Sequence, residues 1–220
     1  MQVLLTIGWD GEPDALEQAL VAEARRSVDG GDVSSAVVNV RLGGAAFAEV
    51  AAVNNERDAF AMVKLRDPTS TDAALGFTLP DGARLVGGYA SDEIDQKPYV
   101  RTWPSGIPSP GVKLVCFVRR TPSISHDQYL EHWRERHAPL AIRVQPAFWH
   151  YVQNHVSDWL TRDTPDFDGI GEIHCRTPGD LFTKMYADDE ARRLIWEDMD
   201  RFMVNDRSTV LTARETVVAP

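Results

Sequence analysis

A proline-rich stretch near the middle of the chain limits the fold more than any other sequence feature. Residues 96–110 include Pro98, Pro104, Pro108 and Pro110. Proline fixes φ and lacks an N–H group, so this stretch favours extended chain over a helix or a central strand. Each flanking segment is long enough to fold as a small domain. The sequence therefore predicts a module at 1–95, a linker at 96–110 and a second module at 111–220.

The hydrophobic pattern gives the same order of elements on both sides of this linker. Before it, strands are predicted at 3–9, 36–42, 59–65 and 84–90, with helices at 13–28 and 69–75. After it, strands are predicted at 112–118, 148–156, 170–175 and 209–218, with a helix at 125–144 and helical segments within 177–202. Both halves read βαββαβ, the ferredoxin-like order. Such a sheet has one uncovered face. We therefore expect an α+β fold of two tandem ferredoxin-like modules packed sheet to sheet as an intrachain α+β barrel.

Charge and composition narrow the partners and the compartment. The formal net charge of −10 disfavours nucleic acid and anionic membranes as partners. No apolar run approaches the roughly 20 residues that span a bilayer, and the start of the chain lacks the basic region of a signal peptide. The two cysteines suit small buried side chains better than a disulfide. We expect a cytoplasmic protein, and a homodimer of the whole chain stays open.

The groups that titrate near neutral pH are concentrated in the second module. It contains all six histidines of the chain, namely His126, His132, His137, His150, His155 and His174. On the helix at 125–144, Tyr129, Trp133 and His137 recur every four residues, so they share the face directed at the sheet. His132 lies about 140° around the helix from His137. The two cannot bind one metal from that helix, and no metal site is expected.

Strand alternation assigns further side chains to faces. In the strand at 148–156, Trp149, Tyr151 and His155 fall on one face and Asn154 on the other. In the next strand, Glu172 and His174 share a face, which suggests that they line a cavity or pair with each other. A single histidine more often packs or is exposed than catalyses, so only the cluster indicates a site.

Three stretches of the second half resemble the EthD family: KLVCFVRR at 113–120, YLEHWRERHAPL at 129–140 and YVQNHV at 151–156. Residues 168–173, Asp200-Arg201-Phe202 and Glu215 are similar as well. EthD proteins are a branch of the dimeric α+β barrel superfamily. The resemblance implies two sheets facing each other, here within one chain, and a ligand cavity between sheet and helices. Superfamily members include polyketide cyclases and dehydratases, monooxygenases without metal or flavin, and haem-binding enzymes. Only His137 carries over as a motif position.

These observations predict a cofactor-independent lyase, cyclase or dehydratase that acts on an aromatic or polyketide-like carbonyl compound. His137 is expected to be the general base, Tyr151 to polarise the carbonyl, and His155 or His174 to be the partner acid. The substrate-binding residues are expected to be Tyr129, Trp133, Trp149, Asn154 and Glu172. A monooxygenase, either free of cofactor or dependent on haem, is the first alternative. A non-catalytic protein that binds a small molecule is the second.

Overall fold

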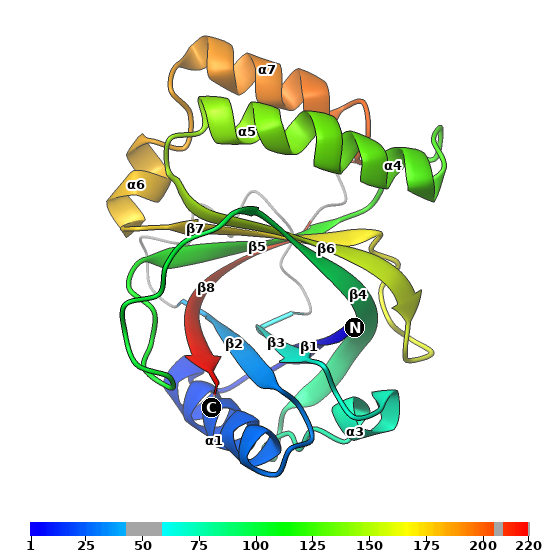
Figure 1. Cartoon of the computed structure of the whole chain (residues 1–220), viewed down its shortest axis with the longest axis vertical. Helices are drawn as coiled ribbons and strands as arrows, with labels where there is room; N and C mark the ends of the chain where they lie inside the picture. The colour runs from blue at the N-terminus through cyan, green and yellow to red at the C-terminus, as the bar shows by residue number, and fades with distance from the viewer. Residues whose placement is uncertain (43–58, 205–208, 220) are drawn as a thin grey trace.

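Antiparallel strands close into a barrel in the computed structural model, which describes residues 1–42, 59–204 and 209–219 (Figure 1). Around the barrel the order is β1-β3-β2-β8-β5-β7-β6-β4. The bounds are β1 (Gln2–Gly8), β2 (Ser35–Arg41), β3 (Ala61–Arg66), β4 (Arg84–Lys97), β5 (Val112–Val118), β6 (Phe148–Trp159), β7 (Gly169–Cys175) and β8 (Thr209–Val218). The mixed α+β class is confirmed.

The two halves of the chain meet edge to edge. Strands up to residue 97 follow the order β4-β1-β3-β2, and strands from 112 onward follow the order β8-β5-β7-β6. Backbone pairing of β2 with β8 and of β4 with β6 joins the two sets. The expected α+β barrel is therefore confirmed. The expected sheet-to-sheet packing is corrected, because hydrogen-bonded seams join the two sets of strands into one continuous wall.

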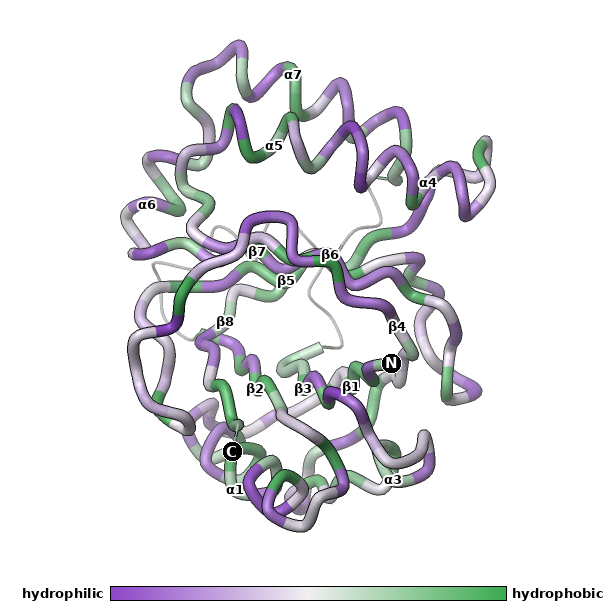
Figure 2. Tube along the Cα trace, in the orientation of Figure 1, coloured by the Kyte–Doolittle hydropathy of each residue, from purple (hydrophilic) through white to green (hydrophobic). Residues whose placement is uncertain are grey.

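The seam at β4 explains the largest error in the predicted strands. We expected this strand to end at Ala90, but it continues to Lys97 and pairs with β6 along the way. The added stretch, SDEIDQK, is strongly hydrophilic (Figure 2). Because this stretch lacks alternating apolar residues, the sequence does not predict a strand there. The strand forms because its backbone pairs with β6. The first two residues of the expected linker, 96 and 97, therefore belong to a strand.

Helices cover the barrel on opposite sides (Figure 1). α1 (Pro13–Asp29) and α3 (Thr71–Leu75) lie against the strands of the first half. α4 (His126–His132), η1 (Trp133–His137) and α5 (Ala138–Val144) follow one another without a break, and α6 (Pro178–Thr183) and α7 (Asp189–Met199) lie on the same side. Among the described residues, no helix has the length and apolar character needed to cross a bilayer.

The helix predicted at 125–144 carries a local irregularity that positions the site. Ser125 caps it: the Gln128 amide donates to Ser125 Oγ at 3.2 Å, and the Ser125 amide donates to Gln128 Oε1 at 2.8 Å. η1 is a wide π-helical turn just before Pro139, whose missing N–H removes one helical hydrogen bond. Trp133 and His137, at the two ends of this turn, are both buried.

Segment 98–111 is joined to β8 by backbone hydrogen bonds. The Gly106 and Ser109 amides donate to the carbonyls of Val217 and Glu215, each at 2.7 Å. The rings of Tyr99 and Trp103 stack with centroids 5.7 Å apart. The expected extended chain is interrupted by a turn at Ser105-Gly106, where Gly106 has a φ of 72°, and the stretch is anchored to β8.

Candidate functional site

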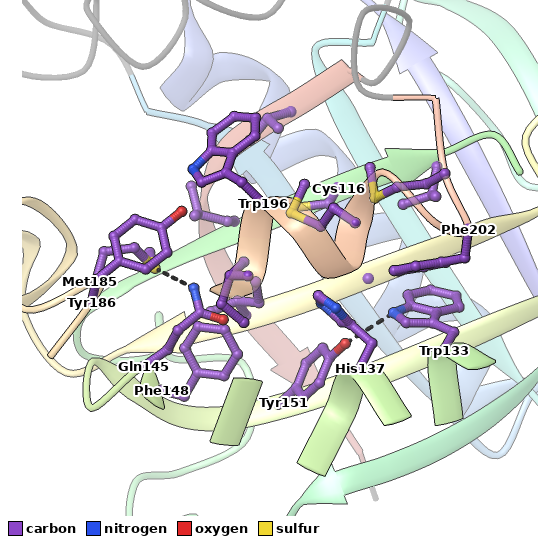
Figure 3. Close-up of a pocket in the computed structure, with 18 residues that line it drawn as sticks. Cys116, Trp133, His137, Gln145, Phe148, Tyr151, Met185, Tyr186, Trp196 and Phe202 are labelled. Carbon is purple, nitrogen blue, oxygen red and sulfur yellow. Dashed lines mark hydrogen bonds between the residues drawn. The ribbon is translucent and has the colours of Figure 1, made fainter. Parts of the chain in front are cut away.

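A mainly apolar cavity of about 240 Å³ lies between the outer face of the second set of strands and the helices above it (Figure 3). Apolar walls come from the strands (Leu114, Cys116, Val118, Phe148, Gly171, Ile173, Val210), from the helical layer (Trp133, Met185, Ile195, Trp196, Met199) and from Phe202 and Met203. The polar groups are those of His137, Gln145, Tyr151 and Tyr186. This is the sheet-and-helix cavity that the helix face predicted.

His137 forms a pair with a carboxylate that the sequence analysis did not single out. Its Nδ1 lies 2.8 Å from Asp198 Oδ2, and Nε2 of His132 lies 2.9 Å from Asp198 Oδ1. Burial alone would raise the pKa of Asp198, but the hydrogen bonds to His137 and His132 outweigh it and lower the pKa. An ionised Asp198 accepts from His137 Nδ1–H, so Nε2 is the nitrogen available to a molecule in the cavity.

Tyr151 is arranged as a hydrogen-bond donor toward the same cavity. Its hydroxyl oxygen accepts from Trp133 Nε1 at 3.0 Å and from Gln153 Nε2 at 3.1 Å. With both acceptor positions filled, the hydroxyl hydrogen is left to donate. Burial raises the pKa of Tyr151, so the group stays protonated at neutral pH. Figure 3 shows its oxygen beside His137 and Trp133.

Two predicted residues lie behind Trp133 and do not line the cavity. Tyr129 is fully buried, with its ring 5.5 Å from that of Trp133. The His155 ring also stacks on Trp133, with centroids 5.5 Å apart, and its Nε2 lies 3.1 Å from Gln153 Oε1. Burial, followed by the nearby Arg134, lowers the pKa of His155 to about 4. Both residues support Trp133, and His155 is neutral at pH 7.

Trp149 does not share a face with Tyr151, so that prediction is wrong. A β-bulge between Phe148 and His150 interrupts the alternation. Trp149 instead packs against Tyr99 at 5.1 Å, and the Arg176 guanidinium lies 5.1 Å from the centre of its ring. The bulge turns Phe148 into the cavity wall in its place.

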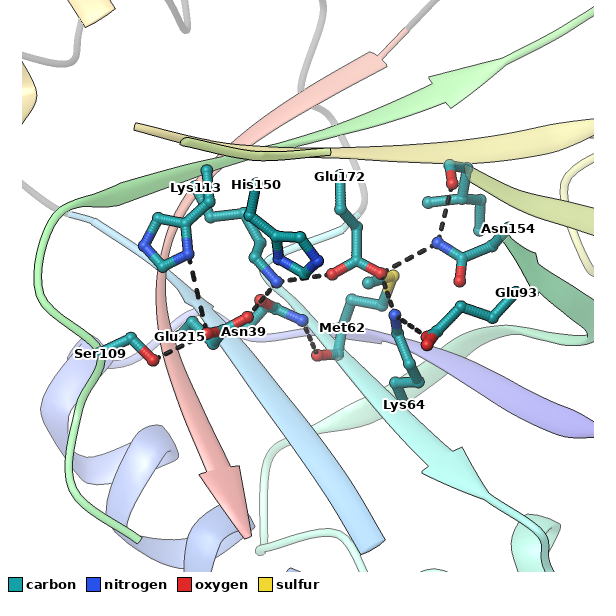
Figure 4. Close-up of polar contacts among 12 residues, drawn as sticks. Asn39, Met62, Lys64, Glu93, Ser109, Lys113, His150, Asn154, Glu172 and Glu215 are labelled. Carbon is teal, nitrogen blue, oxygen red and sulfur yellow. Dashed lines mark hydrogen bonds and ion pairs between the residues drawn. The ribbon is translucent and has the colours of Figure 1, made fainter. Parts of the chain in front are cut away.

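Asn154 and Glu172 point into the barrel, on the opposite side of the sheet from the cavity (Figure 4), and strand alternation places His174 on the same face as Glu172. Glu172 forms ion pairs with Lys64 and with Lys113, the latter at 2.6 Å. It also accepts from Asn154 Nδ2 at 2.9 Å. Glu172 thus pairs with lysines and not with His174. The sheet separates these three residues from His137, so they cannot contact a molecule bound beside it.

Further charged groups complete this buried network. Glu215 pairs with Lys113 and accepts from Ser109 Oγ at 2.7 Å. Burial would raise the pKa of Glu215, but Lys113 outweighs it and the pKa falls to about 2. Burial lowers the pKa of His174 to about 4, and its Nε2 lies 2.9 Å from the Pro110 carbonyl oxygen. The carboxylates and lysines pair with one another, which fits a structural role, whereas His174 Nδ1 has no hydrogen-bond partner among the described residues.

The sequence held signals for some of the functional residues that were missed. Asp198 sits on the buried face of α7 with Ala191 and Ile195, a placing at which a carboxylate needs a partner. Gln145 directly follows α5 and carries no periodic signal. Cys116 lines the cavity, and burial raises the pKa of its thiol to about 12, so it is not a thiolate at neutral pH. Within the described ranges, no cluster of three or more histidine, cysteine or acidic residues is placed to hold a metal.

Comparisons with known proteins support the resemblance. Residues 121–206 match the model of the EthD domain. A solved anthrone oxidase-like protein matches with 13% identity and a TM-score of 0.58, over 98% of this chain and 92% of that chain. A candidate monooxygenase from Lactobacillus acidophilus NCFM matches with 7% identity and a TM-score of 0.54, over 99% of this chain and 96% of that chain. No curated protein matches significantly. At these identities the two solved structures share the fold alone.

Proposed function

We propose that this chain, which carries an EthD domain at residues 121–206, is an enzyme that removes a proton next to a carbonyl group of a small aromatic or polyketide-like molecule. One observation supports this most directly. The His137–Asp198 pair and the hydroxyl of Tyr151 converge on one apolar cavity. A base and a hydrogen-bond donor in a water-poor site are what enolisation requires.

The proposed chemistry uses both groups together. His137 Nε2 takes the proton, the C–H bonding electrons pass into the enolate, and Tyr151 donates a hydrogen bond to the developing oxyanion. Asp198 stabilises the imidazolium that forms. The imidazolium can then protonate a hydroxyl group on the β-carbon, which leaves as water. Alternatively, the enolate carbon attacks a second carbonyl and closes a ring, and the imidazolium gives its proton to the alkoxide that forms. These outcomes correspond to dehydratase or lyase and to cyclase activity.

The cavity walls favour an uncharged substrate. Among the described residues, no lysine or arginine lines the cavity. Trp133, Phe148 and Phe202 offer ring faces and edges to a flat molecule. A carboxylate or phosphate would enter without a partner, at a large desolvation cost. We therefore expect a neutral aromatic ketone.

The test is exchange of the α-protons of α-tetralone, a bicyclic aromatic ketone, for deuterium in D₂O, followed by proton NMR. His137→Ala is expected to slow exchange at least about a hundredfold because the base is lost. The control is His126→Ala, since His126 is partly exposed and does not line the cavity. Exchange at the wild-type rate in His137→Ala would remove this residue from the mechanism.

Oxygenation is the second candidate, and the descriptions of the two structural neighbours favour it. It would begin with the same proton removal, after which the carbanion reacts with O₂. A CH₂ group becomes C=O and one molecule of water is released, with O₂ as the oxidant. Oxygen uptake with anthrone distinguishes this route from the first candidate. Uptake that is equal in wild type and His137→Ala would refute a role for the site.

Haem, which some superfamily members bind, fits the cavity poorly. His137 could supply a nitrogen to the iron, but no described arginine or lysine of the lining could pair with the propionate groups. A Soret band in the purified protein would contradict this. Saturable binding of the ketone with no exchange and no oxygen uptake would indicate a non-catalytic binding protein instead.

We also propose that the barrel is two tandem ferredoxin-like modules with a boundary in 96–110. The matching orders β4-β1-β3-β2 and β8-β5-β7-β6 support a duplication. On this view only the second module provides the catalytic cavity, and the first closes the barrel.

A further inference from the structure

The cavity has a second polar group away from its catalytic groups. Gln145 follows the last residue of α5, where its backbone N–H donates to the backbone carbonyl of Ala141 at 2.8 Å. The Phe148 amide donates in turn to the Gln145 carbonyl at 3.2 Å. This turn fixes the backbone and directs the side chain into the cavity. Figure 3 shows Gln145 beside Met185 and Phe148, at the far end from Trp133.

The side-chain amide of Gln145 has a weak partner. Its Nε2 donates to Met185 Sδ at 3.4 Å, and a thioether is a poor acceptor. The residue is only 5% exposed. Among the described residues, Met185 is the one side chain bonded to this amide. A buried amide with so weak a partner favours a ligand that supplies a better one.

We propose that Gln145 is a specificity-determining residue that hydrogen-bonds a second oxygen of the substrate, on the side of the molecule away from the reacting carbonyl. This inference rests on the proposed function and narrows its substrate to ketones with a distal hydroxyl or carbonyl oxygen. The Gln145 amide suits both, because its oxygen accepts from a hydroxyl and its NH₂ donates to a carbonyl.

The surroundings make this contact discriminating. Phe148, Met185 and Ile173 line this end of the cavity without a strong hydrogen-bond group, and Tyr186 is the other polar residue that Figure 3 shows there. A molecule without the distal oxygen would exclude water from the Gln145 amide and give nothing in return. His137 and Tyr151, at the other end, would then hold the reacting carbonyl and its α-carbon in a fixed orientation.

The test is a cycle of two ligands and two proteins. Dissociation constants of α-tetralone and 6-hydroxy-1-tetralone, whose hydroxyl lies across the ring from the carbonyl, are measured by quenching of tryptophan fluorescence. In wild type, the hydroxyl is expected to tighten binding about tenfold. In Gln145→Met, which keeps the side-chain length but lacks the amide, that gain disappears while α-tetralone still binds. Gln18→Met, on the exposed side of α1, is the matched control and retains the gain.

A tenfold gain that persists in Gln145→Met would overturn the proposal, as would the absence of any gain in wild type. If Gln145→Met binds neither ketone, Gln145→Asn replaces it; the shorter amide should bind α-tetralone without a gain from the hydroxyl, and a retained gain overturns the proposal. The outcomes that refute the proposed reaction differ from those that refute the role of Gln145. A hydroxyl preference without α-proton exchange refutes the chemistry alone, and exchange without the preference refutes the role of Gln145 alone. Failure of both ketones to bind wild type refutes both.

Discussion

Replacing Asp198 with asparagine tests whether the buried carboxylate sets the protonation of His137, the proposed general base. In the native site the carboxylate contacts His137 Nδ1 at 2.8 Å and His132 Nε2 at 2.9 Å. A carboxylate accepts from both rings. The asparagine amide has one oxygen and one NH₂ group, so one ring must accept where it previously donated. If that ring is His137, its proton moves to Nε2 and the base facing the cavity is lost.

The size of the effect follows from the bond that changes. A hydrogen bond to a charged group contributes about 1.5–3 kcal/mol. Losing it from the imidazolium formed in the transition state slows proton removal roughly ten- to a hundredfold. Asp198→Asn should therefore reduce α-tetralone exchange by that factor and leave ketone binding nearly unchanged, since Asp198 does not line the cavity.

The measurement is the exchange rate in D₂O, together with circular dichroism to confirm folding. His132→Gln is the matched control, because it removes the second imidazole but keeps the His137–Asp198 contact. This control should lose less than Asp198→Asn. Wild-type exchange by a folded Asp198→Asn protein would refute the reasoning, and so would equal losses in both variants.

Three further predictions concern the hydrogen bond that Tyr151 donates, the free energy of unfolding, and the pH dependence of that free energy. Tyr151→Phe should slow exchange about tenfold to a hundredfold while binding persists, since only the donor to the oxyanion is lost; exchange at the wild-type rate would exclude that donor role. Lys113→Met should lower the free energy of unfolding by about 3–5 kcal/mol, seen in urea titration, because Glu172 and Glu215 lose a buried partner; a change below about 1 kcal/mol would mean that water replaces the lysine. The pKa of His174 is lowered from 6.5 to about 4 in the folded protein, so the unfolded chain binds a proton at this residue at a higher pH than the folded protein does. The contribution of His174 to the free energy of unfolding is therefore complete above pH 6.5. It falls between pH 6.5 and pH 4, by up to about 1.4 kcal/mol per pH unit. His174→Asn should reduce that slope, and an unchanged slope between pH 6.5 and 4 would contradict the assignment.

The order of elements was predictable because apolar periodicity decides it in most of the chain. The helix face with Trp133 and His137 followed from spacing alone, and so did the placing of Tyr151 on the opposite face of its strand from Asn154. The bulge that turns Trp149 away did not, because one inserted residue reverses a face and leaves no trace in composition. Asp198 could not be assigned to His137 from sequence, since α7 approaches η1 only through tertiary packing.

The buried charges show why the two halves pair within one chain. Lys64 and Lys113 lie in mostly apolar strands, at positions that alternation directs into the barrel. The second half supplies one buried cation, Lys113, for two buried carboxylates, Glu172 and Glu215. The second cation for Glu172 is Lys64 of the first half, and Lys64 also pairs with Glu93 on β4 at 2.6 Å. Removing the first half would leave these carboxylates with too little positive charge in a dry interior. The buried charges of the barrel interior therefore balance only when both halves are present, whereas the cavity on the outer face of the second half takes no part in this pairing.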